Sequence, residues 1–242
     1  MQAIYEPKGR AREYAPLAVN LYRGCGVGCR YCYGPSVLRM SRDEFHDDPK
    51  PRPGVLKALE KDADKYRGTS RPVLLCFTCD PYQPINDDFQ LTANAIRILN
   101  THGIAVHILT KRPSAADADL ELLAKWAPHN WLGVTLTCTG DVKSDKWEPY
   151  ADTPGERIAS LAKAHRMGIP TWVSLEPVLS PASALSLIDQ THHYVDLYKV
   201  GKWNYDARAK EIDWPEFRKR VIDKLEGYGK SYLIKKDLLE AR

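Results

Sequence analysis

The stretch that decides the fold is Asn20–Pro35, which reads NLYRGCGVGCRYCYGP. It contains Cys25, Cys29 and Cys32, in the spacing C-x-x-x-C-x-x-C. Cysteine thiolates are the usual protein ligands of iron–sulfur clusters, and a cubane cluster normally takes four of them. Three thiolates on one short loop therefore predict a [4Fe–4S] cluster with one iron left open. The open iron implies a ligand that the protein itself does not supply.

A structural zinc site is the alternative interpretation of the same cysteines. Zinc would need a fourth ligand, and the candidates are His46, Cys76, Cys79 and Cys138. The spacing favours the cluster, because structural zinc sites usually use C-x-x-C or Cys/His pairs. A disulfide framework is not expected, since nothing at the N-terminus resembles a secretion signal.

The cysteine segment carries a resemblance to a known family. With Tyr31 before its last cysteine, the segment is similar to the C-x-x-x-C-x-aromatic-C signature of radical S-adenosylmethionine (SAM) enzymes. The resemblance implies a [4Fe–4S] cluster and SAM as cofactors, with Tyr31 near the SAM site. In that family the methionine end of SAM binds the open iron, and reductive cleavage releases a 5′-deoxyadenosyl radical. An electron donor such as flavodoxin or ferredoxin is then an expected partner.

The composition fits one globular domain. The chain has 242 residues, of which 43% are hydrophobic and 27% charged, enough for a full α/β core. A formal net charge of +4 agrees with a nucleic-acid partner without requiring one. No apolar run has the length of a bilayer span, so we expect a cytoplasmic protein without membrane contact. We also expect a monomer.

The pattern of apolar segments predicts the fold class. Residues 1–16 are polar and basic, which predicts a solvated N-terminal arm before a domain at 17–242. Six strands are predicted at 17–22, 73–79, 104–110, 131–138, 169–175 and 194–200, with a loop at 41–53. Helices are predicted at 55–66, 89–102, from an N-cap at Ser114 to about 126, 153–167, 181–189 and 214–225. This alternation predicts an open (β/α)6 partial TIM barrel, with the cluster loop after its first strand.

Polar residues gather where the predicted strands end. Ligands of parallel sheets bind at the carboxyl ends of the strands. SAM needs a cation for its carboxylate, and Lys111 and Arg157 are the candidates. It also needs an anion for its ammonium or ribose, and Asp80 and Glu176 are the candidates. The other candidate cofactor-binding residues at strand ends are Thr78, Cys79, Thr135 and Thr137.

Four further segments resemble the spore photoproduct lyase branch of radical SAM enzymes. They are the YCY around Cys32, DPYQP at 80–84, the pair at 110–111, and KVGK at 199–202 followed by IDW at 212–214. The resemblance implies that Cys79 and Lys111 hold SAM and that Tyr33 returns a hydrogen atom. Cys79 ends the neighbouring strand, so we also include it with Tyr33 as a catalytic candidate. The chain departs from the branch at Phe77, where the lyases have a hydrogen-donating cysteine.

Three functions follow as hypotheses. The first is a radical SAM enzyme that acts on nucleic acid, as a lyase in DNA repair or as a modifying enzyme. The basic and aromatic residues at 199–236 favour this hypothesis. The second is a radical SAM enzyme that acts on a peptide or small metabolite, and the third is a zinc-stabilised nucleic-acid-binding protein. Metal analysis separates the third from the others, and salt-dependent DNA binding separates the first from the second.

Overall fold

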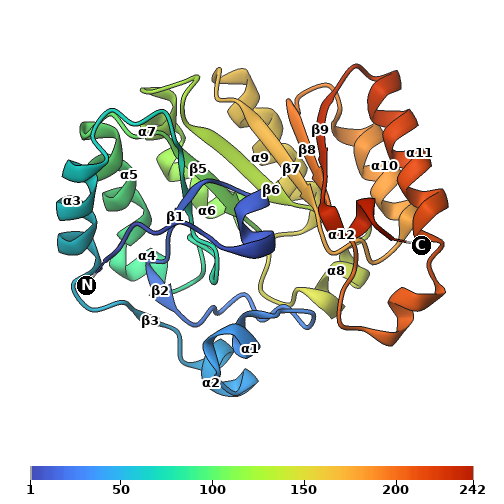
Figure 1. Cartoon of the computed structure of the whole chain (residues 1–242), viewed down its shortest axis with the longest axis horizontal. Coiled ribbons are helices and arrows are strands. Elements are labelled where there is room, and N and C mark those ends of the chain that lie inside the picture. Colours follow the sequence, from blue (N-terminus) through green and yellow to red (C-terminus); the bar gives the residue numbers. More distant parts are fainter. Residues whose placement is uncertain (1, 242) are drawn as a thin grey trace.

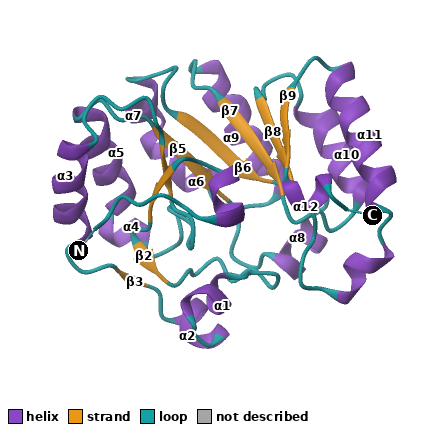
Figure 2. Ribbon diagram, viewed as in Figure 1, coloured by secondary structure: helices purple, strands orange, loops and turns teal. Residues whose placement is uncertain are grey.

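The computed structural model describes residues 2–241 of the chain, and its centre is a seven-stranded parallel sheet (Figures 1 and 2). The strands are β1 (Leu17–Val19), β4 (Val73–Leu75), β5 (Val106–Thr110), β6 (Trp131–Thr135), β7 (Thr171–Leu175), β8 (Leu197–Val200) and β9 (Ser231–Ile234). They lie side by side in that order, and each pairs in parallel with the next. Every carboxyl end therefore meets the same edge of the sheet, as in a partial barrel.

The six predicted strands are confirmed, and β9 is an addition to them. β9 is short and its residues are at most half-buried, so it lacks the apolar run that marks the central strands. The predicted strands were too long at several ends. In particular, the residues after Leu75 and after Thr135 leave the sheet and form loops at its carboxyl edge.

The main helices cover the outer face of the sheet. Figure 1 shows α3 (Val55–Lys65) and α5 (Leu91–Thr101) at one end of the sheet, and α10 (Pro181–Thr191) and α11 (Trp214–Gly227) at the other. Between them, α9 (Pro154–Arg166) begins with the expected capping box, because Thr153 and Glu156 exchange hydrogen bonds. Two clusters of fully buried apolar side chains lie between helices and sheet, one on each half.

The helix predicted from Ser114 differs from the expectation. The chain forms α6 (Pro113–Ala116), the 3-10 turn η2 (Asp117–Asp119) and α7 (Leu120–Ala124) instead of one helix. The predicted N-cap is wrong, because Pro113 already occupies the first helical position and Arg112 precedes it. Proline is favoured at that position, since its nitrogen has no hydrogen to donate.

The N-terminal segment packs against the sheet. Ala3 and Ile4 are buried, and Asp62 of α3 accepts hydrogen bonds from both of their amides. Tyr5 forms an antiparallel bridge to Ala18 of β1. The prediction of a solvated arm is therefore wrong for these residues. The segment continues into the 3-10 helix η1 (Gly9–Glu13), which crosses in front of the sheet in Figure 1.

Short elements line the carboxyl edge of the sheet. They are β2 (Tyr22–Arg23) and β3 (Lys50–Pro51), which pair with each other, α1 (Gly34–Leu38), α2 (Arg42–Asp47), α4 (Asn86–Phe89), α8 (Asp141–Trp147), η3 (Ala207–Glu211) and α12 (Lys236–Leu239). The loop predicted at 41–53 is wrong in part, because Ser41 caps α2 by accepting a hydrogen bond from Glu44. Among residues 2–241, no helix has both the length and the apolar character of a membrane span.

Candidate active site

The three motif cysteines lie on the loop between β2 and α1, and neighbouring elements hold this loop in place. The amide of Cys25 donates to the carbonyl of Phe45 in α2, at 2.8 Å. The Arg42 guanidinium donates to the carbonyls of Cys29, at 2.8 Å, and Cys32, at 3.4 Å. α2 therefore holds the backbone of all three motif cysteines.

A glycine and a glutamine complete this support. Gly24 has a φ of +85°, and a Cβ at this position would lie 2.7 Å from the Phe45 carbonyl oxygen. Only glycine fits so close an approach. The Gln83 side chain accepts from the Gly26 amide at 2.8 Å and donates to the Gly24 carbonyl at 3.3 Å. Gln83 was not among the predicted site residues, although it belongs to the DPYQP segment.

The environment of the cysteines is suited to a multi-metal cluster. Burial, Asp80 and the other cysteines raise the pKa of Cys25, so an isolated thiolate is disfavoured there and a bound cation would stabilise it. Within residues 2–241, no three His, Cys, Asp or Glu side chains, these cysteines included, converge closely enough to hold a single ion. A cubane spans a wider set of thiols than one zinc ion does. His46, one proposed zinc ligand, uses Nδ1 to contact the Cys25 carbonyl oxygen at 2.9 Å.

Lys111 provides a positive charge beside the loop. Its ammonium nitrogen lies 5.7 Å from the centre of the Tyr31 ring, and no hydrogen-bond acceptor contacts it among the described residues. Burial acts to lower the pKa of Lys111, but Cys29, Glu148 and Asp80 outweigh it, so the pKa is raised. The amine is therefore charged at neutral pH and available to an anionic group such as the carboxylate of SAM.

Asp80 connects the ends of two strands to the cluster loop. Its carboxylate accepts from the Thr110 hydroxyl at 2.6 Å, the Lys111 amide at 2.7 Å and the Tyr82 amide at 2.9 Å. Its own amide donates to the Cys25 sulfur at 3.3 Å. Asp80 therefore links the segment after β4 to the end of β5, and both of its carboxylate oxygens accept hydrogen bonds from the protein.

The predicted threonines lie at the same edge of the sheet. Thr78 places a buried hydroxyl oxygen there without a hydrogen-bond partner in residues 2–241, as expected for a group that meets a ligand. Thr135 is the last residue of β6 and Thr137 follows two residues later, and both are buried. The Thr137 hydroxyl contacts the Cys138 sulfur at 3.5 Å.

Arg157 belongs to a buried network that the sequence did not predict in full. Its guanidinium pairs with Glu148 at 2.7 Å and donates to the carbonyls of Asp152, at 2.8 Å, and Thr135, at 3.0 Å. Glu148 also accepts a hydrogen bond from the Tyr31 hydroxyl. Both members of the ion pair are almost completely buried, at 1% and 0% side-chain exposure. Arg157 thus fixes Tyr31 through Glu148, and its guanidinium is not a free cation.

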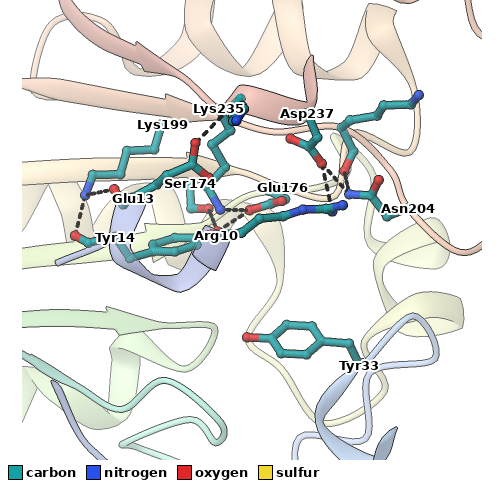
Figure 3. Close-up of polar contacts among 12 residues, drawn as sticks. Arg10, Glu13, Tyr14, Tyr33, Ser174, Glu176, Lys199, Asn204, Lys235 and Asp237 are labelled. Atoms are coloured by element: carbon teal, nitrogen blue, oxygen red, sulfur yellow. Dashed lines mark hydrogen bonds and ion pairs between the residues drawn. The ribbon is translucent and has the colours of Figure 1, made fainter. Parts of the chain in front are cut away.

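Glu176 lies farther along the edge, in a polar cluster that Figure 3 shows. Its carboxylate accepts hydrogen bonds from the Tyr14 hydroxyl and the Lys235 ammonium group. Gly201 leaves room for it, because a Cβ there would lie 2.5 Å from the Glu176 carboxyl carbon. Lys199 donates to the Tyr14 carbonyl at 2.6 Å. Tyr14 was missed because it comes from the N-terminal segment, whereas Lys235 was included only among the basic residues at 199–236 and not as a partner of Glu176.

The two predicted catalytic residues differ in exposure. The Tyr33 side chain faces Tyr14 and Glu176 across the site in Figure 3. It is 43% exposed, and its hydroxyl donates to the Phe77 carbonyl at 3.3 Å. Cys79 is buried, and its thiol donates to the Tyr22 carbonyl at 3.6 Å. Tyr33 is thus at the open mouth of the site, whereas Cys79 lies beneath the cluster loop.

A family model decides what this site is. The model of the radical SAM superfamily matches residues 19–183, which include the cysteine loop, Lys111 and Arg157. The chain belongs to the radical SAM superfamily. It is a radical SAM enzyme whose cofactors are a [4Fe–4S] cluster and SAM. The cluster supplies the electron for reductive cleavage of SAM. Cys25, Cys29 and Cys32 fit the cluster. The Lys111 ammonium and the Thr78 hydroxyl, which have no partner among residues 2–241, fit the polar groups of SAM.

Two relatives show how the chain compares in sequence. Protein MJ0683 of Methanocaldococcus jannaschii is 24% identical over 217 residues, which cover 87% of this chain and 81% of that protein. A radical SAM Nalpha-GlyT isomerase of Pseudomonas phage M6 is 26% identical over 155 residues. That match covers 64% of this chain but 31% of the isomerase, so most of the phage protein has no counterpart in the alignment.

Two solved structures have the same fold. Spore photoproduct lyase with bound AdoMet and dinucleoside spore photoproduct matches with a TM-score of 0.71 and 15% identity, over 96% of this chain and 78% of that one. Streptococcus suis SuiB bound to S-adenosylmethionine matches with a TM-score of 0.68 and 12% identity, over 90% of this chain and 49% of that one. These likenesses confirm the expected partial-barrel architecture.

Proposed function

We propose that this radical SAM enzyme acts on a nucleic-acid substrate, as a lyase or a modifying enzyme. The observation that carries the proposal is a row of aromatic rings at the mouth of the site. The ring centre of Phe77 lies 6.1 Å from that of Tyr33 and 5.9 Å from that of Tyr14. Aromatic side chains of this kind stack on nucleobases, which all have a flat π face.

Two lysines lie next to this row. The Lys235 ammonium is 3.5 Å from the centre of the Tyr14 ring, and that of Lys199 is 5.7 Å from it. Both lysines are buried and bonded to protein groups, Lys235 to Glu176 and Lys199 to the Tyr14 carbonyl, so they hold the Tyr14 ring in its place in the row. The fold shared with a lyase structure that holds a dinucleoside spore photoproduct supports the same substrate class.

Equilibrium binding of a short single-stranded DNA tests the substrate class. Because one base–aromatic stack is worth about 1–3 kcal/mol, Tyr33→Leu should weaken binding roughly five- to hundredfold. Tyr228→Leu, at the residue that follows α11, is the matched control, because Tyr228 is 40% exposed against 43% for Tyr33 and lies away from the site. Equal effects of the two substitutions, or binding that salt does not weaken, would favour a peptide or a small metabolite as substrate.

We also propose that Tyr33 returns a hydrogen atom to the product, with Cys79 as the second member of the relay. Both residues adjoin the cluster loop, and phenols and thiols can donate a hydrogen atom. Tyr33→Phe and Cys79→Ala should both keep the cluster and the formation of 5′-deoxyadenosine, yet divert product into misquenched adducts. Normal product from Tyr33→Phe would remove the tyrosine from the relay, and normal product from Cys79→Ala would leave Cys79 with a cofactor role alone.

A further inference from the structure

A second polar pocket lies outside the site described so far. Its volume is about 230 Å³, and it is lined by Arg30, Lys146, Trp147, Asp206 and Arg208. These residues come from three parts of the chain: the cluster loop, α8, and the segment at the start of η3. None of the roles assigned above uses this pocket.

The pocket is in direct contact with the cluster loop. Arg30 follows the cluster ligand Cys29, and its amide donates to the carbonyl of Trp147 at 2.9 Å. The ring centre of Trp147 is 6.2 Å from that of Tyr31, the aromatic residue of the cysteine motif. Two residues of the pocket wall, Arg30 and Trp147, are therefore in contact with the cysteine loop itself.

The lining of the pocket is basic, and one of its cations is held in place. Arg30, Lys146 and Arg208 are exposed cations, and Asp206 is the one carboxylate among the lining residues. The Arg208 guanidinium is held by Asp206 at 2.8 and 2.6 Å. It also lies on the faces of two indoles, 4.7 Å from the Trp147 centroid and 4.9 Å from that of Trp203. Asp206 offsets the charge of Arg208, and Arg30 and Lys146 leave the lining with a net positive charge, which attracts an acidic partner.

We propose that this pocket is the docking site of the reductant, a small acidic electron-transfer protein of the flavodoxin or ferredoxin class. On docking, the donor loses one electron, and the metal group held by Cys25, Cys29 and Cys32 gains it. No atom or proton needs to move between the two proteins. The inference goes beyond the proposed function, because it does not depend on the substrate.

The position of the pocket favours a donor over a substrate as its occupant. Trp147 and Arg30 cover the cluster loop from the side of α8, whereas the aromatic row of Tyr33, Phe77 and Tyr14 lies at the strand ends. A donor at the pocket would approach the cluster without entering the substrate mouth. Electron transfer slows steeply with distance, so the surface that adjoins a cluster ligand is the effective place to dock.

Binding of an acidic flavodoxin to the reconstituted protein tests the proposal, with intrinsic tryptophan fluorescence as one readout. Lys146→Glu should weaken flavodoxin binding about tenfold at low salt, and the difference should shrink towards about 0.5 M salt. Lys61→Glu on α3 is the matched control, because it makes the same charge change at an exposed lysine at the other end of the sheet. Its affinity for flavodoxin should stay within about twofold of the unmodified protein.

The rate of cluster reduction gives a second readout. Reduction by reduced flavodoxin should slow in Lys146→Glu, whereas reduction by dithionite should be unchanged, because that small reductant needs no docking surface. Absence of saturable flavodoxin or ferredoxin binding to the unmodified protein would overturn the proposal. Equal losses in Lys146→Glu and Lys61→Glu would overturn it too. So would a Lys146→Glu variant that loses affinity for DNA and keeps its affinity for both donor proteins.

Discussion

Removal of the Lys111 ammonium group should weaken SAM binding while the cluster stays in place. Lys111 is half-buried beside Tyr31, and no acceptor in residues 2–241 contacts its ammonium group, so a bound carboxylate would gain a charge-assisted hydrogen bond there. Such bonds are worth about 1.5–3 kcal/mol, which corresponds to a loss of affinity of roughly ten- to hundredfold. Lys111→Met is the suitable change, because it keeps an unbranched apolar side chain against the Tyr31 ring.

Isothermal titration of the reconstituted variant with SAM measures the effect, and the iron content shows whether the cluster is intact. Arg112→Met is the matched control. Arg112 is the next residue along the chain, but its guanidinium donates to the Tyr82 carbonyl at 2.8 Å and faces α4. An affinity of Lys111→Met for SAM equal to that of the control would refute the role of Lys111.

The other predictions concern the cluster, the buried ion pair and one lysine. Cys32→Ala should abolish the brown colour of the reconstituted protein, whereas Cys138→Ala, which removes a buried thiol outside the loop, should keep it. Glu148→Ala should lower the free energy of unfolding in urea by about 3–5 kcal/mol, because it leaves the Arg157 charge buried and unpaired; a loss below about 1 kcal/mol would contradict this. Burial and Lys235 lower the pKa of Lys199 from 10.5 to about 8. Between these two pH values the folded state therefore binds fewer protons than the unfolded chain. Stability should therefore rise with pH from about 8 to 10.5, and Lys199→Met should flatten the rise.

The fold could be predicted to the extent that its elements have a local pattern. Central strands such as Val73–Leu75 are buried on both faces, so they appear as apolar runs in the sequence. The capping box at Thr153 is equally local. β9 is different, because it is held by its pairing with β8 and by the Lys235 amide, which donates to the Val200 carbonyl at 2.9 Å. Such long-range contacts leave no periodic signal.

The sequence indicates candidate site residues where residue type and position along the chain carry the signal, and the roles of these residues stay predictions. The cysteine motif and the lysine after β5 are of this kind. Tyr14 and Glu148 are not, since each meets its partner only after distant segments pack together: Tyr14 contacts Glu176, and Glu148 contacts Tyr31. Their residue types alone are common at exposed positions, so the sequence offered no reason to select them.

The hydrogen-bond partners divide the predicted cofactor residues into two groups. The Asp80 carboxylate and the Arg157 guanidinium are each held by several protein groups, so a ligand could reach them only at the expense of those contacts. Lys111 and Thr78 instead present groups without a protein partner in the described part of the chain. A buried polar group without a partner is costly unless a ligand satisfies it. We therefore expect Asp80 and Arg157 to shape the SAM site, and Lys111 and Thr78 to contact the cofactor.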